Sequence, residues 1–547
     1  GKPVPCSKPV RPSNDLYTVS RSSADDSAQI SIYYSGKMTN EDSRFNWGGV
    51  HYADELLYAM GVGFFSEYVS MTRHWMPCYD HPRDKVQYSG TFIVPDSLTA
   101  ISNGTLLREK DTLQGMKTYH WSMSDPVATY LLTFAIGDFR TTAFPLPGKE
   151  FPARVYSYDS DIAQRNAAEV FAMVPEMVAA YEHYFEVPYP FEALDYYTAS
   201  RGAMEHQTLI TMNHEQVSQR AAADDSLYLT AAHELSHQWF GDLVSPLNFK
   251  NAWLNEGFAT YCEALWMEYR RGKNAYYDEI LNTKQDYLYR TIPREGLLPL
   301  HHYQRRTDNN YPQTIYNKGA LILAMLRDKL GDDLFEILHN YLSDNMHGHA
   351  TTGEFISYCT GRIDSSFWQE WVYSSGIPRL DIGIEASDSQ YSIHIAQIQE
   401  SERIFSVPLS FEIEHTSGSK DTITMQTHTP DSNYTKRSNR EIAQIRLLPS
   451  VYPFETKEIH FTSAASDLSL EETRIQWDRN SESLKINVPQ KRDYELSLKT
   501  VDGKTVKSHR GSFVGPMYFD CSSIEPGYYF LEVRYGAVYW EKRVRLK

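Results

Sequence analysis

Apolar and polar residues alternate at both ends of the chain, whereas in the middle apolar residues recur at every third or fourth position. Residues 1–155 contain β-forming runs such as Val86–Val94, each followed by turn residues. The pair Asn103-Gly104 predicts a hairpin turn, although Asn103-Gly104-Thr105 is also a formal glycosylation sequence. The segment Asp161–Phe185 has helical spacing instead, and Pro175 inside it predicts a kink or a break.

Helical periodicity continues until a cluster of helix-breaking residues at Gly376-Ile377-Pro378. Further helices are expected at Ser226–Phe240, Glu256–Arg270, Asn317–Leu330 and Thr352–Cys359. The chain then returns to the alternation that is typical of strands, as in Tyr391–Ile398 and Ser406–His415.

A last module begins near residue 470, with strands at Tyr494–Leu498 and Gly527–Val533 and a turn at Asp502-Gly503. The order β, α-rich, β, β predicts a multidomain α+β protein. We expect domains at residues 1–155, 156–378, 379–470 and 471–547, of which the last two are β-sandwich-like.

Composition narrows the function classes. A length of 547 residues exceeds what one hydrophobic core supports. The net charge of −17 argues against nucleic acid as a partner, because phosphate binding needs a cationic face. The sequence contains no run of about 18 apolar residues, so no membrane-spanning helix is predicted. The five cysteines, Cys6, Cys78, Cys262, Cys359 and Cys521, are too scattered for a disulfide framework or a thiolate metal site.

The strongest chemical signal is His233-Glu234-Leu235-Ser236-His237. Residues four apart share a helix face, so both imidazoles can reach one metal ion. Glu234 points about 100° away around the helix, where it can contact a water bound to that ion. Glu256 follows nineteen residues after His237, and its carboxylate would complete a three-ligand zinc site with an open position.

His233–Asp242 together with Trp253–Ala259 resembles the gluzincin zinc aminopeptidases, the family of aminopeptidase N and the leukotriene-epoxide hydrolase. The resemblance runs from about residue 30 to about residue 465. It includes Arg73–Lys85, which is similar to the signature of the family's N-terminal domain. It implies a β-rich N-terminal domain and a thermolysin-like catalytic domain that holds one Zn²⁺. The N-terminal domain is shorter here than is usual in the family, so either the chain is truncated or the domain is reduced.

The resemblance also implies substrate-binding residues. Gly202-Ala203-Met204-Glu205 is similar to the family's exopeptidase motif, in which the glutamate binds the free α-amine and the backbone pairs with the peptide as an edge strand. His206 stands where the family usually has Asn. The family's second amine-binding Glu or Gln would fall on Tyr68, and Glu67, one residue away, is the candidate for that role.

A tyrosine at the position of Tyr316, before a Lys-Gly pair, donates its hydroxyl to the oxyanion in this family. Thr260 and Glu263, one and two turns beyond Glu256, are candidates to orient the ligands. We therefore expect a zinc aminopeptidase in which Glu234 is the general base and peptides with a free N-terminus are the substrates. A hydrolase of another bond, such as an epoxide, and a catalytically inactive binding module are the alternatives.

The C-terminal module resembles the sorting domain of the bacterial type IX secretion system in three stretches, Asp502–Val506, Ser523–Val533 and Glu541–Lys547. An unrelated small β-sandwich is the alternative. The resemblance implies a protein that is secreted by, or attached to the surface of, a Gram-negative bacterium and that uses the secretion machinery as a partner. The start at Gly1, without Met, is expected to be a trimmed or recombinant end.

Overall fold

The computed structural model describes residues 6–7, 18–19, 29–41, 46–53, 56–64, 69–112, 114–158, 161–199, 201–219, 225–301, 311–387, 390–463, 474–478, 483–500, 504–525, 527–535 and 538–546. Gly1–Met38 forms one compact unit, in which β1 (Cys6–Ser7) pairs with β2 (Thr18–Val19). Thr39–Lys547 forms the second unit, which carries all other elements. Within the described ranges, no helix has both the length and the apolar composition needed to cross a membrane.

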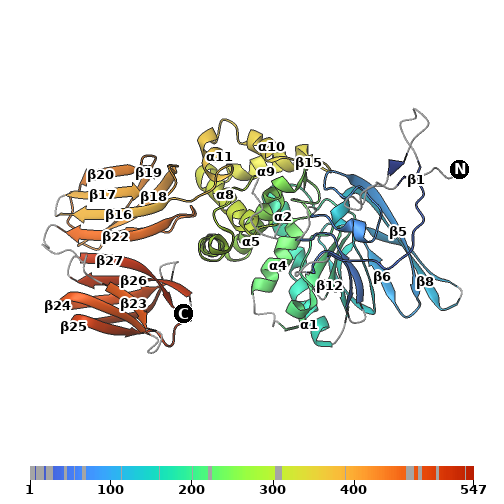
Figure 1. Cartoon of the computed structure of the whole chain (residues 1–547), viewed down its shortest axis with the longest axis horizontal. Helices are drawn as coiled ribbons and strands as arrows, with labels where there is room; N and C mark the ends of the chain where they lie inside the picture. Colours follow the sequence, from blue (N-terminus) through green and yellow to red (C-terminus); the bar gives the residue numbers. More distant parts are fainter. Residues whose placement is uncertain are drawn as a thin grey trace. The chain divides into compact units, whose positions relative to one another are not determined.

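Strands dominate the N-terminal part of the second unit, as the alternation predicts (Figure 1). They are β3 (Gly49–Ala53), β4 (Leu56–Met60), β5 (Lys85–Pro95), β6 (Thr99–Ser102), β7 (Thr105–Thr112), β8 (Met116–Ala128) and β9 (Phe134–Gly137). One sheet has the order β3-β4-β9-β6 and another the order β5-β8-β7. The predicted β-rich N-terminal region is therefore confirmed.

The hairpin predicted at Asn103-Gly104 is wrong. A turn is present, with Gly104 at φ +86°, but β6 and β7 on either side of it belong to different sheets. Asn103 is fully buried, and its side-chain amide donates to the carbonyls of Leu131 and Gln207. The residue therefore connects the short 3-10 helix Thr129–Leu131 to the loop at Gln207, and its burial also makes it a poor glycosylation acceptor.

The sheet of the catalytic part extends across the domain boundary predicted at residue 155. It has the order β10 (Phe139–Pro145), β11 (Pro152–Tyr158), β12 (Leu194–Ala199) and β13 (Leu209–Asn213). The β10–β11 pair is antiparallel, whereas β11–β12 and β12–β13 are parallel. Period-two alternation alone does not tell which sheet a strand joins, so the sequence assigned β10 to the preceding domain.

Helices follow this sheet. Their bounds are α1 (Asp161–Phe171), α2 (Val174–Phe185), α3 (His214–Gln219), α4 (Asp225–Ser236), α5 (Trp253–Arg271), α6 (Lys273–Asp286), α7 (Ile292–Glu295), α8 (Thr314–Leu330), α9 (Asp333–Asp344), α10 (Thr352–Tyr358) and α11 (Ser365–Trp371). The break predicted near Pro175 separates α1 from α2, with the proline in the first turn of α2, where it needs no N–H. Helix α4 ends four residues before the predicted Phe240, because the chain turns at Gly241 with φ +133°.

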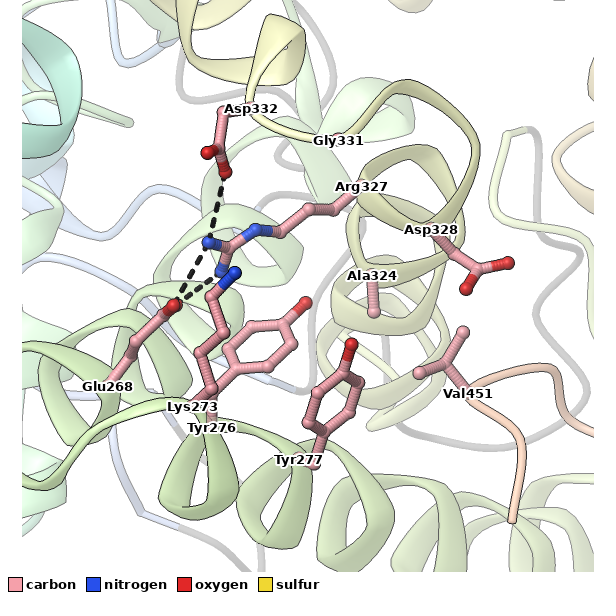
Figure 2. Close-up of a pocket in the computed structure, with 10 residues that line it drawn as sticks. All are labelled: Glu268, Lys273, Tyr276, Tyr277, Ala324, Arg327, Asp328, Gly331, Asp332 and Val451. Atoms are coloured by element: carbon pink, nitrogen blue, oxygen red, sulfur yellow. Dashed lines mark hydrogen bonds and ion pairs between the residues drawn. The ribbon is translucent and has the colours of Figure 1, made fainter. Parts of the chain in front are cut away.

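An ion pair holds the C-terminal part of α5 against α8. The Arg327 guanidinium binds the Glu268 carboxylate through both terminal nitrogens and also reaches Asp332 (Figure 2). The Tyr276 ring of α6 lies 4.7 Å from the guanidinium carbon, and both partners of the ion pair are about nine-tenths buried. Two long helices of the catalytic part are thereby fixed relative to each other.

The C-terminal part consists of strands. They are β16 (Arg379–Ala386), β17 (Gln390–Gln397), β18 (Val407–His415), β19 (Lys420–Thr427), β20 (Asp431–Arg437), β21 (Ile442–Leu447), β22 (Glu455–Ser463), β23 (Arg474–Asp478), β24 (Ser483–Lys499), β25 (Thr505–Asp520), β26 (Gly527–Tyr535) and β27 (Val538–Leu546). Short β14 (Ser245–Pro246) and β15 (His349–Ala350) pair within the helical region. The turn predicted at Asp502-Gly503 lies outside the described residues.

Candidate active site

The two histidines of the motif lie at the C-terminal end of α4. His237 follows the last residue of the helix, but its amide still donates to the carbonyl of His233 at 3.3 Å, so the helical spacing of the pair is kept. The two imidazole centroids are 4.7 Å apart. Gly241 lets the chain turn back directly after the pair, because any side chain there would collide with Asn255 of α5.

Glu256 meets both imidazoles from the first turn of α5. One of its oxygens, Oε2, lies 3.3 Å from Nε2 of His233 and 3.3 Å from Nε2 of His237. One ligand atom from each of the three residues lies within 4.8 Å of the other two. Two imidazole nitrogens and a carboxylate oxygen are a donor set that zinc prefers, so the residues present fit this ion.

The other ring nitrogens are oriented by hydrogen bonds. Nδ1 of His237 donates to the carbonyl of Phe240 at 2.9 Å, and Nδ1 of His233 donates to Glu263 at 2.7 Å. These bonds leave both Nε2 atoms directed at Glu256, which is the arrangement that a metal-binding histidine requires. Of the two residues predicted to orient ligands, Glu263 therefore makes such a contact.

The three residues form a strongly coupled charged cluster. Burial alone raises the pKa of Glu256, but the charge of His237 and the hydrogen bonds from both imidazoles outweigh burial and lower the pKa to about 2. Burial lowers the pKa of His237, but the negative charges of Glu205 and Glu256 raise it to about 9. The carboxylates thus provide the negative field that stabilises a cation at this point.

Glu234 faces the same cavity as the three residues. Its side chain is buried, and burial raises its pKa to about 8. Within the described part of the chain, its Oε2 has no hydrogen-bond partner. A buried carboxylate oxygen without a protein partner, next to a candidate metal site, is suited to accept a proton from a water molecule.

Glu205 enters the cavity from the loop between β12 and β13. Met204 pairs with Thr211 in an antiparallel bridge, so residues 202–205 extend the edge of β13. Gly202 has φ +51°, and a Cβ atom there would lie 1.8 Å from the Trp47 ring. Glu205 is 4% exposed and accepts a hydrogen bond from Asn255 at 3.0 Å. Its carboxylate therefore lies at the wall of the cavity next to an extended backbone edge.

His206 does not line this cavity. The Gly61 amide donates to its Nε2 at 3.1 Å, so Nδ1 carries the proton and donates to the Thr211 hydroxyl at 2.8 Å. Burial lowers the pKa of His206 to about 3, which keeps the ring neutral. His206, which replaces the family's Asn, therefore contributes to the packing between β4 and β13. Glu67 and Tyr68 lie outside the described residues.

Tyr316 lies in the first turn of α8, and its ring stacks 6.1 Å from that of His233. Helices α5 and α8 touch at Gly257 and Gly319, where a Cβ atom on either residue would lie 2.6 Å from the other's Cα. This close crossing brings Tyr316 beside Glu256, and it gives a physical reason for the glycine of the Lys-Gly pair.

The cavity gathers the predicted residues with others that the sequence did not reveal. Its lining is Trp47, Val62, Phe64, Ala203, Met204, Glu205, His233, Glu234, His237, Glu256, Tyr311 and Tyr316. Sequence reasoning missed Trp47, Phe64 and Tyr311, which are three unremarkable aromatics among many, and Asn255, which holds Glu205. Asn255 precedes Glu256 directly, so its place on the same helix was the one available signal.

Two family models match the chain. "Peptidase family M1 domain" matches residues 170–371, which include every residue of the candidate metal site. "Peptidase M1 N-terminal domain" matches residues 10–131.

Several named proteins are similar in sequence. Aminopeptidase M1-D of Oryza sativa subsp. japonica is 28% identical over 335 residues, which are 58% of this chain and 37% of that protein. Probable aminopeptidase 1 of Saccharolobus solfataricus is 26% identical over 372 residues, which are 63% of this chain and 46% of that protein. The chain therefore spans less than half the length of these curated relatives.

Solved structures show the same fold. Aminopeptidase A of Legionella pneumophila, in complex with aspartic acid, is 21% identical with a TM-score of 0.63, covering 75% of this chain and 48% of that one. An M1 zinc metallopeptidase of Deinococcus radiodurans is 23% identical with a TM-score of 0.51, covering 62% of this chain and 74% of that one. The two M1 models thus match the N-terminal and catalytic regions of this chain, and the solved structures share their fold.

Proposed function

We propose that this protein is a zinc-dependent aminopeptidase that removes the N-terminal residue from peptides. One observation carries the proposal: the candidate ligands His233, His237 and Glu256 line one cavity together with the carboxylates of Glu234 and Glu205. Among the described residues, Oε2 of Glu234 has no hydrogen-bond partner. The aminopeptidase names of the relatives support the same reaction.

The metal would be held by His233, His237 and Glu256, with Glu263 orienting His233 through its Nδ1. Zinc bound there would lower the pKa of a water molecule towards 7 and polarise the substrate carbonyl. These two histidines and one carboxylate leave a position open for that water, as catalytic zinc sites do.

Protein residues bind the substrate, transfer the proton and stabilise the developing negative charge. Glu205 binds the ammonium group at the peptide's N-terminus, and residues 202–204 pair with the peptide backbone. Glu234 accepts the proton of the attacking water and then donates it to the leaving amine. The Tyr316 hydroxyl donates a hydrogen bond to the oxygen of the scissile carbonyl as negative charge develops on it. Glu67 stays a predicted second ligand for the amine.

The exopeptidase assignment is tested with a double comparison between Glu205 and the substrate amine. The Glu205→Ala variant should raise KM for a free-amine anilide and keep its zinc, because the ammonium pairing exists in the ground state as well as in the transition state. N-acetylated substrate should be cleaved poorly by wild type and suffer little further loss in the variant. Equal cleavage of both substrates by wild type would favour an endopeptidase instead.

Two rivals are separated by the same assays. An inactive binding module would release no product from any aminoacyl anilide, with or without a chelator. A hydrolase of another bond would turn over an epoxide substrate faster than an anilide. The cavity gives a reason to prefer the peptidase, because a buried carboxylate beside an edge strand is suited to an ammonium group next to a peptide.

We also propose that residues 379–470 and 471–547 are two β-sandwich-like modules, the second serving secretion from a Gram-negative bacterium. A separate apolar core in the last module supports this division. It consists of Leu484, Ile486, Tyr494, Leu496, Leu498, Phe519, Cys521, Leu531, Val533, Val544 and Leu546. Fusing residues 471–547 to a periplasmic reporter should direct it to the surface only in cells with a type IX system. Equal export without that system would reject the proposal.

A further inference from the structure

Aromatic rings line part of the cavity that holds the candidate metal ligands. Trp47 and Phe64 meet edge to face at 5.2 Å, Phe64 lies 6.3 Å from Tyr311, and Tyr311 lies 6.0 Å from Tyr316. The four rings come from two regions that are far apart in sequence, residues 47–64 and 311–316. We call Trp47, Phe64 and Tyr311 the aromatic wall, since Tyr316 already has a proposed catalytic role.

The wall continues the surface beside Glu205. Gly202 packs directly against the Trp47 ring, where a Cβ atom would lie 1.8 Å from it, and Met204 and Val62 also line the cavity. A peptide whose ammonium group is held by Glu205 therefore has its first side chain next to apolar and aromatic surface.

Among the described residues, no lysine or arginine lines this cavity, and its two histidines are candidate metal ligands. An acidic first residue would find no free cationic side chain among them. The carboxylates that line it are Glu205, Glu234 and Glu256, and all three have proposed roles. A basic first side chain would therefore have no further carboxylate among these residues to pair with. Burying either charge without a partner is costly, whereas burying an apolar side chain is favourable.

One buried carboxylate holds two residues of the wall. Oε1 of Glu41 accepts from the Trp47 amide at 2.8 Å, and Oε2 accepts from the Phe64 amide at 2.9 Å. Glu41 is 4% exposed, so these bonds are shielded from water. His51 donates to the Trp47 carbonyl at 2.6 Å, which fixes the other backbone polar group of that residue. Glu41 thus sets the spacing between two backbone segments whose rings form the wall.

We propose that the aromatic wall selects peptides whose first residue has a large apolar side chain, and that Glu41 is the positioning residue that holds Trp47 and Phe64 in place. This inference rests on the proposed aminopeptidase function. It adds the class of substrate, because neither the metal site nor Glu205 determines which first side chain is preferred.

The test measures kcat and KM for p-nitroanilides of leucine, phenylalanine, alanine, glutamate and lysine. Wild type should prefer leucine or phenylalanine over alanine in kcat/KM by at least about tenfold, because each extra methylene in a fitting pocket contributes severalfold. Glutamate and lysine should be the poorest substrates. A preference for glutamate or lysine, or no preference, would overturn the inference.

Variants locate the selectivity. Trp47→Ala and Phe64→Ala should each lower the leucine-to-alanine ratio about tenfold, mainly through KM for leucine. The ratio is independent of the fraction of folded enzyme, so reduced stability does not imitate this effect. Unchanged ratios in both variants would contradict the role of the wall.

Glu41→Ala should lower the same ratio, and Glu41→Gln should restore part of it, because the carboxamide keeps one acceptor oxygen. Glu385→Gln, at an exposed position on β16, is the matched control and should keep the wild-type ratio. If Glu41→Gln and Glu41→Ala both retain the wild-type ratio, Glu41 does not position the wall.

A binding measurement separates this inference from the proposed reaction. In the Glu234→Gln background, a leucyl tripeptide should bind at least about tenfold more tightly than the alanyl tripeptide by calorimetry. If wild type cleaves no free-amine substrate, the proposed function fails. The difference in affinity between the two tripeptides still tests whether the aromatic wall selects large apolar side chains. Equal affinities, or no binding of either peptide, would overturn it.

Discussion

His206 is a buried imidazole whose charge state is fixed by its neighbours. Its Nε2 accepts from the Gly61 amide and its Nδ1 donates to Thr211, so a second proton on the ring would displace the first of these bonds. Because burial lowers its pKa to about 3, the folded protein holds His206 neutral where the unfolded chain, with a pKa near 6.5, binds a proton.

This difference predicts acid sensitivity. The unfolded state binds more protons between pH 6.5 and about pH 3, so stability falls as pH falls through that window, by about 1.4 kcal/mol per pH unit from this residue. His206→Asn should flatten the slope of unfolding free energy against pH between 6.5 and 4, whatever its effect on stability at pH 7. Urea unfolding at several pH values measures the slope. A slope as steep as that of wild type would show that other groups cause the acid sensitivity.

The crossing of α5 and α8 is the feature of the helices on which the site depends most. Glu256 and Gly257 lie in the first turn and a half of α5, and Tyr316 and Gly319 lie in the first two turns of α8. The glycine contact allows the backbones to approach, and the Arg327–Glu268 ion pair holds the helices at another point along them (Figure 2).

Gly319→Ala should therefore disturb catalysis from a distance. The new methyl group would lie 2.6 Å from the Cα of Gly257 and push the helices apart. We expect a loss of about tenfold or more in kcat, since misplacing a catalytic group by about 1 Å costs up to 100-fold, together with about 1–3 kcal/mol of stability. Steady-state kinetics and urea unfolding measure both. Gly353→Ala in α10, where the added methyl meets no close backbone, is the control. Wild-type kcat in Gly319→Ala would mean that the crossing does not position Tyr316.

The sequence predicted those parts of the site that depend on local spacing. The His233–His237 pair is a four-residue step on one helix, so its common face follows from helix geometry. Glu256 was predicted from its ligand type and its spacing after His237, whereas Glu205 and Tyr316 came from family resemblance. The structure brings these residues to one cavity, while their roles stay proposals. No sequence pattern links Glu41 with Phe64 or Asn255 with Glu205, because these contacts, 23 and 50 residues apart, arise only when separate segments pack. The end of α4 and the buried turn at Asn103 were mispredicted for the same reason.

At the scale of the whole molecule, the described residues contain two separate apolar cores. One extends from the N-terminal strands through the helices to Phe454 and surrounds the candidate site. The other is confined to residues 484–546. Strand β22 pairs with β27 over Ile459–Phe461, so a sheet continues from one part to the other although the cores do not.

Removal of residues 471–547 should therefore leave the chemistry intact. We expect kcat/KM for an aminoacyl anilide within about twofold of the full chain, because no residue of the cavity belongs to the second core. The shortened chain should associate more readily, since β22 loses its neighbour and exposes a strand edge. Kinetics and size-exclusion chromatography measure these effects. A tenfold loss of turnover in a monomeric, folded truncation would show that the last module contributes to the site.

The central claim is that Glu234 is the base beside a metal held by His233, His237 and Glu256. The most direct test measures zinc content and turnover in one preparation of the Glu234→Gln variant. The substitution preserves shape and removes the proton acceptor, so we predict about one zinc per chain and a turnover at least about 100-fold below wild type, the usual contribution of a general base. A variant that keeps its zinc and more than about a tenth of the wild-type rate would contradict the account.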